Sequence, residues 1–374
     1  MRVSQICSAI ESTIKATNQK ERSGHIKLLA EILRGEASLE IIDHLQCLPS
    51  TQSRLGYEGL AYWLTERTKK VGSTQAIEDL NRYLTAPLIS YHVVMVLGNI
   101  NVKEPVELAN DTRLVPFAEV PDSFWKEEVL EEYKQFAPSL QPSAGLLHLR
   151  SFKRCHVPVG QPYPPFPKDL YEGVDDARLV LTLVGPSAPA NLGSWDELPP
   201  WVPHRGSSAG GESPLNMGGC FEKKSYDWSK AKPIHGKWVR LSAKEKRHLR
   251  VPLQRLNTAM RRERGVDSAI DLGIALKAVF LSDREPDRGE LGFTLRIRAA
   301  RLLKADRGSR QELSRLIRTL YEIRSSAVHT GEIPEVIQGM RIHRILGEGY
   351  LLTAQAIEHI TMNGEPDWQA IIFS

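Results

Sequence analysis

Residues Ser268–Leu281 most constrain the fold, because their spacing predicts a helix that is apolar on most of its sides. A helix with no polar face cannot lie against water, so it must occupy the centre of a group of other helices. Helical patterns flank this segment on both sides. The sequence therefore predicts an all-α bundle for residues 235–374, with helices expected over 242–264, 268–281, 290–304, 309–330 and 340–360.

The ends of these helices carry local signals. Capping boxes at Ser242-Ala243-Lys244-Glu245 and Ser309-Arg310-Gln311-Glu312 predict two helix starts, because the side chains of the first and last residues bond each other's backbone N–H groups. Asp267 can cap the central helix. Gly331 and Pro334 end the fourth helix.

The preceding chain divides in two by pattern. Residues 1–84 keep helical spacing, whereas residues 85–234 show the short apolar runs and turn signals of β-hairpins. We expect strands at 89–96, 114–117, 146–152 and 178–184, a helix over 124–136, and a long irregular Gly/Pro/Ser-rich loop over 185–219. The predicted class is α+β, with a mixed helical and β-hairpin part followed by the helical bundle.

Composition is that of an ordinary globular protein, with 41% hydrophobic and 25% charged residues. Because there is no long apolar run and no signal-peptide core, we expect a soluble, cytoplasmic protein without a membrane partner. The four cysteines lie far apart in sequence, which argues against a disulfide framework or a zinc site. No motif indicates a metal or a cofactor.

Charge is unevenly distributed along the chain. Between His235 and Arg324 there are 22 Lys and Arg residues but only 11 Asp and Glu residues, although the whole chain carries only +4. An excess of positive charge within one domain suits a polyanion such as nucleic acid, and equally describes a set of solvated helix faces.

Arg324 and His329 lie five residues apart near the predicted end of the fourth helix. A fixed cation and a titratable imidazole can together hold a phosphodiester and move its protons. On an ideal helix they are about 140° apart and about 7.5 Å along the axis, so they do not share a face. Either the last turn loosens, or a two-fold dimer brings two helix ends together. The alternative is an exposed arginine with a histidine that caps the helix.

Three stretches in this part of the chain resemble the HEPN family (higher eukaryotes and prokaryotes nucleotide-binding), in particular its ApeA-like branch. The first comprises Arg255-Leu256-Asn257 and Asp267–Leu276, the second is Arg296–Leu303, and the third is Leu320–Gly331. Order and spacing agree over about 100 residues. Ser325, Lys277 and Thr330 depart from the family pattern.

This resemblance implies a metal-independent endoribonuclease with a composite site at a homodimer interface. Arg324 would grip the scissile phosphate and His329 would act as general acid or base while the 2′-hydroxyl attacks, which leaves a 2′,3′-cyclic phosphate and a 5′-hydroxyl. Supporting candidates are Ser325, Tyr321, Asp271 and His343. Asp271 is also interpreted as structural, because it lies near a helix N-terminus.

The basic helices supply candidate contacts to RNA, either tRNA or single-stranded RNA, at Arg255, Arg261, Arg262, Arg298 and Arg301. Residues 1–234 would then sense a phage or cellular trigger, as expected of an antiphage, abortive-infection or toxin-like effector. Two other hypotheses stay open. One is a catalytically silent HEPN module that binds RNA or a partner protein, and the other is a DNA-binding regulator.

Overall fold

The computed structural model describes residues 3–136, 141–157, 169–185, 187–212, 226–282, 291–304 and 306–373. About 61% of the described residues are helical and about 15% lie in strands, which confirms the predicted α+β class. The chain forms two compact units. Unit 1 comprises residues 1–94, 149–171 and 195–209, and unit 2 comprises residues 95–148, 172–194 and 210–374. The predicted three-part division of the chain stays a prediction.

The N-terminal helices of unit 1 follow the apolar spacing of the sequence. Ile6 and Ile10, and likewise Leu29 and Leu33, are buried on the inner faces of their helices. Asn18 accepts a hydrogen bond from the backbone N–H of Glu21 (2.9 Å) and so starts the second helix. The helices are α1 (Val3–Lys15), α2 (Gln19–Arg34), the 3₁₀ helix η1 (Ala37–Asp43), α3 (Gly56–Val71) and α4 (Ser73–Thr85).

A small sheet interrupts these helices, which the purely helical prediction for residues 1–84 did not include. Strand β1 (Leu45–Cys47) pairs with β2 (Gln52–Ser53) and also with β7 (Cys155–Val157). Both pairings are antiparallel. Since β7 follows β1 by more than 100 residues, no local pattern could reveal that these two strands pair.

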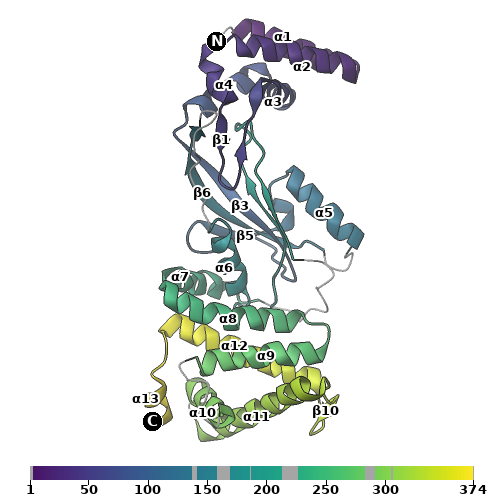
Figure 1. Ribbon diagram of the computed structural model, residues 1–374. Coiled ribbons are helices and arrows are strands. Elements are labelled where there is room, and N and C mark those ends of the chain that lie inside the picture. The colour runs from purple at the N-terminus through teal and green to yellow at the C-terminus, as the bar shows by residue number, and fades with distance from the viewer. Residues whose placement is uncertain are drawn as a thin grey trace. The chain divides into compact units, whose positions relative to one another are not determined.

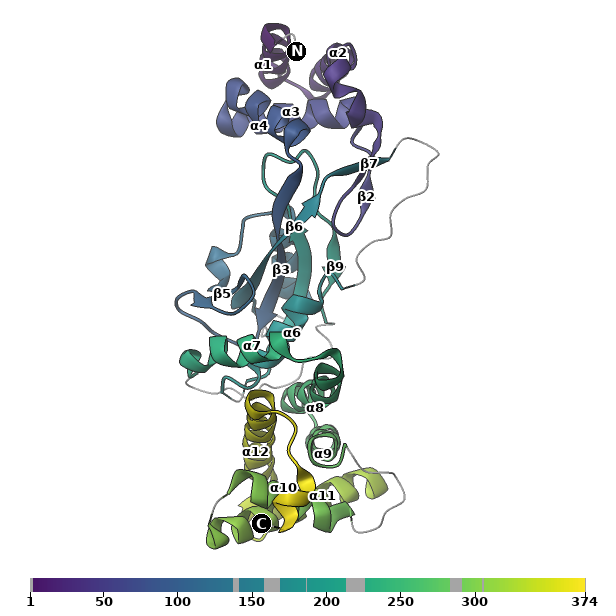
Figure 2. The ribbon, with the colours of Figure 1, turned by 90° about the vertical axis from the view of Figure 1, so that its left-hand side faces the viewer.

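A second sheet has the strand order β4-β5-β6-β3-β8-β9 in the part of the chain that the structure describes. The predicted strands 89–96, 114–117 and 146–152 are found in it, and the predicted helix 124–136 is α5 (Phe124–Phe136). Figures 1 and 2 show the long strands β3 and β6 in this sheet. Its strands are β3 (Leu88–Gly98), β4 (Val106–Glu107), β5 (Thr112–Pro116), β6 (Ala144–Lys153), β8 (Ala190–Glu197) and β9 (Ser208–Gly210).

Two predictions for this region are wrong. The apolar run 178–184 is not a strand but belongs to helix α6 (Glu172–Leu181) and the turn after it. Nearly every side chain there is buried, and a short apolar run buried on all sides has no period that separates strand from helix. The expected loop 185–219 contains β8 and β9, although its residues 186 and 213–219 lie outside the described part.

Unit 2 contains the helical bundle that the sequence predicted for the C-terminal part. Helix α9 lies between α8 on one side and α10 and α11 on the other (Figure 1), and it also packs against α12. Figure 2 views α9 nearly along its axis. The helices are α7 (Ala231–Arg240), α8 (Ala243–Arg261), α9 (Gly265–Phe280), α10 (Leu291–Leu303), α11 (Arg307–Thr330), α12 (Ile342–Asn363) and α13 (Trp368–Phe373).

The helix starts agree with the sequence only in part. The capping box of Ser242 and Glu245 forms as predicted, with both backbone–side-chain bonds present (2.8 and 3.3 Å). The second box does not, because Asp306 takes the cap position earlier and accepts from the N–H of Ser309 (2.8 Å). Asp267 is likewise not a cap but lies in the first turn of α9.

A tight hairpin separates α11 from α12. Strands β10 (Val336–Ile337) and β11 (Met340–Arg341) are joined by Gln338 and Gly339, both with positive φ (50° and 79°). Two consecutive residues with positive φ are typical of a two-residue hairpin turn. Among the described residues, no helix is long and apolar enough to cross a membrane.

Candidate functional site

Arg324 projects from α11 at the place where this helix crosses α9. Ile317, Leu320, Ile323 and Ala327 turn the inner face of α11 into the core, and Arg324 lies half-buried beside them. The opposing position on α9 is Gly273. A Cβ atom at Gly273 would lie 2.4 Å from Cγ of Arg324, so this glycine provides the space that the arginine stem fills.

A cleft of about 420 Å³ adjoins Arg324, between α9, α10 and α11. Within the described residues no acidic side chain pairs with this arginine. Lys277 also borders the cleft and Tyr321, which is 43% exposed, lies at its rim. The remaining walls are mainly aliphatic, from Leu276, Leu281, Leu291, Leu295, Ile317 and Leu320. Such a cleft suits a ligand with a flat apolar body and a negative charge.

His329 lies on the last turn of α11 and is exposed. The helix stays regular through Thr330 and ends at Gly331, whose φ of 71° is in the left-handed region. The Thr330 hydroxyl donates to the carbonyl of Ser326 (2.8 Å), and the Ser326 hydroxyl donates to the carbonyl of Glu332 (3.0 Å). These bonds fix the end of the helix, so the last turn does not loosen to bring His329 round to Arg324.

Within one chain, therefore, Arg324 and His329 point in directions about 140° apart. Of the two arrangements that the sequence left open, only the pairing of two helix ends can bring an arginine and a histidine to one phosphate. The exposure of His329 and the open cleft beside Arg324 leave both groups accessible from outside the chain.

The supporting candidates fall in different surroundings. Tyr321 borders the cleft, Ser325 is half-buried next to Arg324 on α11, and His343 is exposed on the first turn of α12. Asp271 is buried and accepts hydrogen bonds from Arg255 and Arg262 (both 2.8 Å). Those ion pairs tie α8 and the segment after it to α9, which is a structural role.

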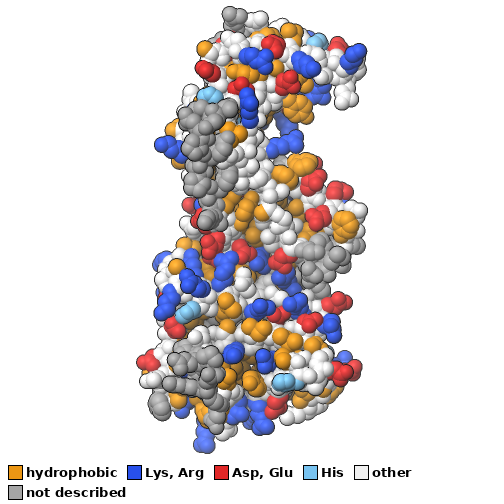
Figure 3. Space-filling view, in the orientation of Figure 1, with side chains coloured by type: hydrophobic (Ala, Val, Ile, Leu, Met, Phe, Trp, Pro, Cys, Tyr) orange, Lys and Arg blue, Asp and Glu red, His pale blue; other side chains and the backbone are white. Residues whose placement is uncertain are grey.

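Four of the five arginines predicted to contact RNA form hydrogen bonds or ion pairs within the chain, although Arg255 and Arg262 are exposed. Arg255 and Arg262 pair with Asp271, and buried Arg261 pairs with Glu212. Buried Arg298 donates to the carbonyl of Phe280 (2.7 Å) and lies over the Trp368 ring. Only Arg301 borders an open groove. Figure 3 shows that Lys and Arg side chains also cover parts of α7 and α8 and the edge formed by α10 and α11.

No family model, curated protein or solved structure matches this chain.

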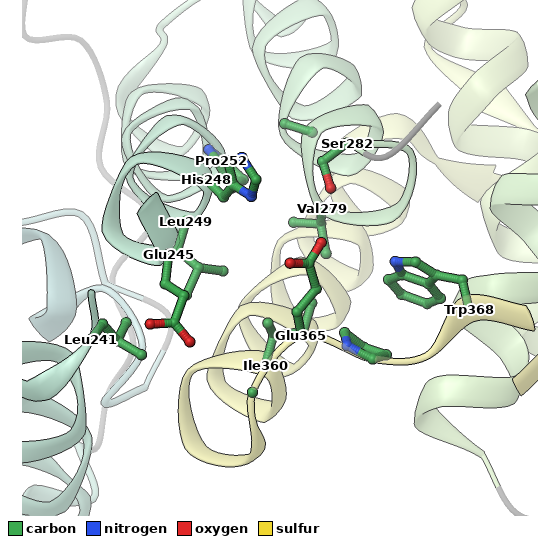
Figure 4. A pocket seen from close by; sticks show the side chains of 13 residues that line it. Leu241, Glu245, His248, Leu249, Pro252, Val279, Ser282, Ile360, Glu365 and Trp368 are labelled. Carbon is green, nitrogen blue, oxygen red and sulfur yellow. The ribbon is translucent and has the colours of Figure 1, made fainter. Parts of the chain in front are cut away.

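A second, smaller pocket is shown in Figure 4. Glu245 and His248 of α8, Glu365 and Trp368 surround it, together with Val279 of α9 and Ile360 of α12. Its volume of about 30 Å³ is that of a single water molecule, so it cannot hold a nucleotide or a peptide. Among the described residues, no group of three or more His, Cys, Asp and Glu side chains is placed to hold a metal ion.

Unit 1 contains a buried polar cluster around Asp196. The Ser50 hydroxyl donates to Oδ2 of Asp196 and also contacts the hydroxyl of Ser207. Burial raises the pKa of Asp196 to about 6, against the opposing effects of the Ser50 hydrogen bond and the positive charge of Arg150. This carboxylate therefore carries an electrostatic cost at neutral pH.

Sequence reasoning also missed a pair of cysteines in unit 1. Cys47 of β1 lies directly opposite Cys155 of β7, although 108 positions separate them in the chain. Both thiols are free. Burial and the neighbouring Cys155 raise the pKa of Cys47 to about 11, so its thiol is protonated at neutral pH.

Proposed function

We propose that this chain is a metal-independent endoribonuclease of the HEPN type. The observation that carries the proposal is the state of Arg324, which borders an open cleft with no acidic partner among the described residues. Arg324 thereby differs from Arg255, Arg261 and Arg262 of the same unit, which are each paired with a carboxylate. An anionic ligand such as a phosphodiester would supply the missing partner.

In the proposed reaction, Arg324 holds a non-bridging oxygen of the scissile phosphate, because its planar guanidinium can donate two parallel hydrogen bonds and keeps its charge. The 2′-oxygen of the ribose forms a bond to phosphorus and the bond from phosphorus to the 5′-oxygen breaks. A base takes the proton of the 2′-hydroxyl, and an acid returns a proton to the departing 5′-oxygen. His329 serves one of these two roles.

Two chains are needed for this chemistry in the proposed enzyme. One helix end presents its arginine and its histidine about 140° apart, whereas two helix ends related by a two-fold axis supply two arginines and two histidines to a shared centre. One imidazole can then act as base and the other as acid. The exposed end of α11 is the part of the bundle that such a dimer would have to cover.

The biological role that we propose is an RNA-cleaving effector, either an antiphage system or a toxin. Unit 2 carries the candidate site, and the N-terminal residues 1–234 would receive a phage or cellular trigger. The buried polar cluster around Asp196 and the helices α1–α4 have no part in the cleavage chemistry and are consistent with a separate regulatory task.

A second candidate is a catalytically silent HEPN module that binds RNA or a partner protein. The divergent directions of Arg324 and His329 within one chain favour it if the chain does not dimerise. One assay distinguishes the two functions: binding and cleavage of tRNA and single-stranded RNA are measured in EDTA. The nuclease cuts RNA, and cleavage is abolished by Arg324→Ala or His329→Ala, whereas the silent module binds RNA equally well with no cleavage.

A further inference from the structure

A groove between α10 and α11 is lined by five arginines and, among the residues that the structure describes, by no acidic side chain. Arg296 and Arg301 come from α10, and the others come from the first third of α11. The groove has a volume of about 650 Å³ and is open to the surface. Its other lining residues are small or neutral: Ile297, Ala300, Gln311 and Ser314. We call it the arginine groove, defined by Arg296, Arg301, Arg307, Arg310 and Arg315.

Apart from Nε of Arg310, the guanidinium groups of the arginine groove have no hydrogen-bond acceptor among the described residues. Nε of Arg296 and Nη1 of Arg301 are buried, and no described residue accepts a hydrogen bond from either. None of the five arginines forms an ion pair with a described residue. Arg310 donates only through Nε, to the carbonyl of Lys304 (2.9 Å). Buried donors without acceptors are costly, and so are clustered like charges, so an anion in the groove would relieve both costs.

Two described carboxylates that are close to these cations in sequence, Asp306 and Glu312, form no ion pair with them. Asp306 is the cap of α11, and its Oδ1 accepts from the backbone N–H of Ser309 (2.8 Å). That bond lowers the pKa of Asp306 and keeps its charge at the helix start. Glu312 is exposed and does not line the groove.

The arginine groove and the cleft at Arg324 lie on the same side of α11. Arg310 and Arg324 are 14 positions apart, which on a helix corresponds to about 21 Å along the axis and only about 40° around it. Between them Ser314, Ile317 and Tyr321 follow the same side of α11 at steps of three and four residues. Ser314 lines the groove, whereas Ile317 and Tyr321 line the cleft.

We propose that the arginine groove binds the phosphodiester backbone of single-stranded RNA several nucleotides away from the bond that is cut. At about 3.4 Å per stacked nucleotide, the 21 Å between Arg310 and Arg324 corresponds to about six nucleotides. This inference extends the proposed function by naming where the enzyme holds its substrate. RNA binding at the groove can nevertheless be measured without any cleavage.

Nucleic acid fits this groove better than an acidic polypeptide does. Arginine forks match the two free oxygens of a phosphate, and successive phosphates along a strand can occupy successive arginines. At the end of the path Tyr321 offers an exposed ring, on which an unpaired base can stack. An acidic peptide could pair with the arginines, but its carboxylates would make no favourable contact with the Tyr321 ring or with the aliphatic walls of the cleft.

The test uses the full chain with a labelled 12-nucleotide RNA that is 2′-O-methylated, so that the attacking hydroxyl is absent and cleavage cannot occur. The groove variant is Arg307→Glu/Arg315→Glu, both exposed positions whose change leaves the core intact. The matched control is Lys244→Glu/Arg247→Glu, which makes the same change in net charge at exposed positions on α8 outside the groove. Circular dichroism and Tm establish that both variants fold.

We expect the groove variant to weaken binding by about tenfold or more at 0.1 M salt and to reduce the slope of log K against log salt by about 1.4, or about 0.7 for each lost phosphate contact. The control should stay within about twofold of wild type. Equal weakening by both variants, no weakening by the groove variant, no RNA binding by wild type, or equally effective competition by polyglutamate would overturn the proposal.

The same variants separate this proposal from the proposed catalysis. With cleavable RNA, groove variants should raise KM and leave kcat unchanged, because the groove binds substrate and transition state alike. If His329→Ala and Arg324→Ala do not affect cleavage but the groove variant still binds RNA more weakly than wild type, the assignment of the catalytic residues is wrong. The proposal that the arginine groove binds RNA is then still supported. If cleavage depends on His329 and Arg324 but the groove variant binds like wild type, the groove fails alone.

Discussion

The stem of Arg324 on α11 occupies the space that a side chain at Gly273 of α9 would fill. A Cβ atom at Gly273 would lie 2.4 Å from Cγ of Arg324 and 3.1 Å from its Cβ. Real Cβ atoms essentially never show a contact of 2.4 Å, so a residue larger than glycine here requires the arginine stem to shift. The absence of a side chain at Gly273 thus sets the position of Arg324.

Gly273→Ala is therefore expected to lower the RNA cleavage rate by about 10- to 100-fold, since a misplacement of about 1 Å costs an oriented group about that much. Gly292→Ala is the matched control, because its added methyl group would meet only the Tyr321 ring at 3.8 Å. Single-turnover rates and Tm should be measured for both. Equal rates for Gly273→Ala and wild type would show that the position of Arg324 is not critical.

Mixing two inactive variants tests whether the site is shared between chains. When Arg324→Ala and His329→Ala chains exchange freely, about half of the dimers are mixed. A mixed dimer retains one arginine and one histidine on different chains, and we expect it to recover activity that neither parent shows. Cleavage rates of the separate and mixed proteins, together with light scattering to establish the dimer, provide the measurement. A mixture as inactive as its parents would argue for a site within one chain.

Asp271 is expected to contribute to stability rather than to chemistry. Asp271→Ala removes two charge-assisted hydrogen bonds from Arg255 and Arg262. We predict a loss of about 2 kcal/mol in the free energy of unfolding, moderated because both arginines remain partly hydrated. Urea unfolding measures this loss, and a double-mutant cycle with Arg255→Ala isolates the pair. At a temperature where the variant is folded, kcat should equal that of wild type; a large fall in kcat would assign Asp271 to the reaction.

Asp196 predicts a pH dependence of the stability of unit 1. Its pKa is about 6 in the folded chain and near the ordinary value of 3.8 when unfolded, so the folded state binds the proton more tightly. Stability from this group therefore falls as pH rises from about 4 to about 6 and is constant above, by on the order of 3 kcal/mol in total.

Asp196→Asn carries no such charge and should remove this dependence. Relative to wild type, the variant should gain stability progressively between pH 4 and pH 6.5, as measured by denaturant unfolding at each pH. Parallel stability curves for the two proteins would show that the buried carboxylate titrates normally.

Apolar periodicity and capping residues predicted correctly those elements that depend on a short stretch of sequence. The helix at 124–136, the Ser242 capping box and the central position of α9 all follow from periodicity and caps over a few turns. The predicted strand at 178–184 is wrong, because a short apolar run that is buried on all sides has no period that distinguishes a strand from a helix. The first residues of this run belong to helix α6. Pairings distant in sequence, such as β1 with β7, leave no local trace.

The candidate site, too, could be predicted only in part from local sequence. Helix arithmetic alone placed Arg324 and His329 on different faces, and α11 is indeed regular through Thr330. The sequence could not show which arginines have a carboxylate partner. Asp271 and Glu212 pair with three of the arginines that were predicted to contact RNA. The arginine groove was hidden for a related reason, since it exists only where α10 and α11 pack side by side.

We propose that Arg324 and His329 cleave RNA without a metal ion. The most direct measurement incubates wild type and His329→Ala with tRNA and single-stranded RNA in EDTA and analyses the product ends. We predict that wild type leaves 2′,3′-cyclic phosphate and 5′-hydroxyl ends, and that His329→Ala cuts at least about 100-fold more slowly. Equal cleavage by both proteins, or products with a free 3′-hydroxyl, would contradict the account.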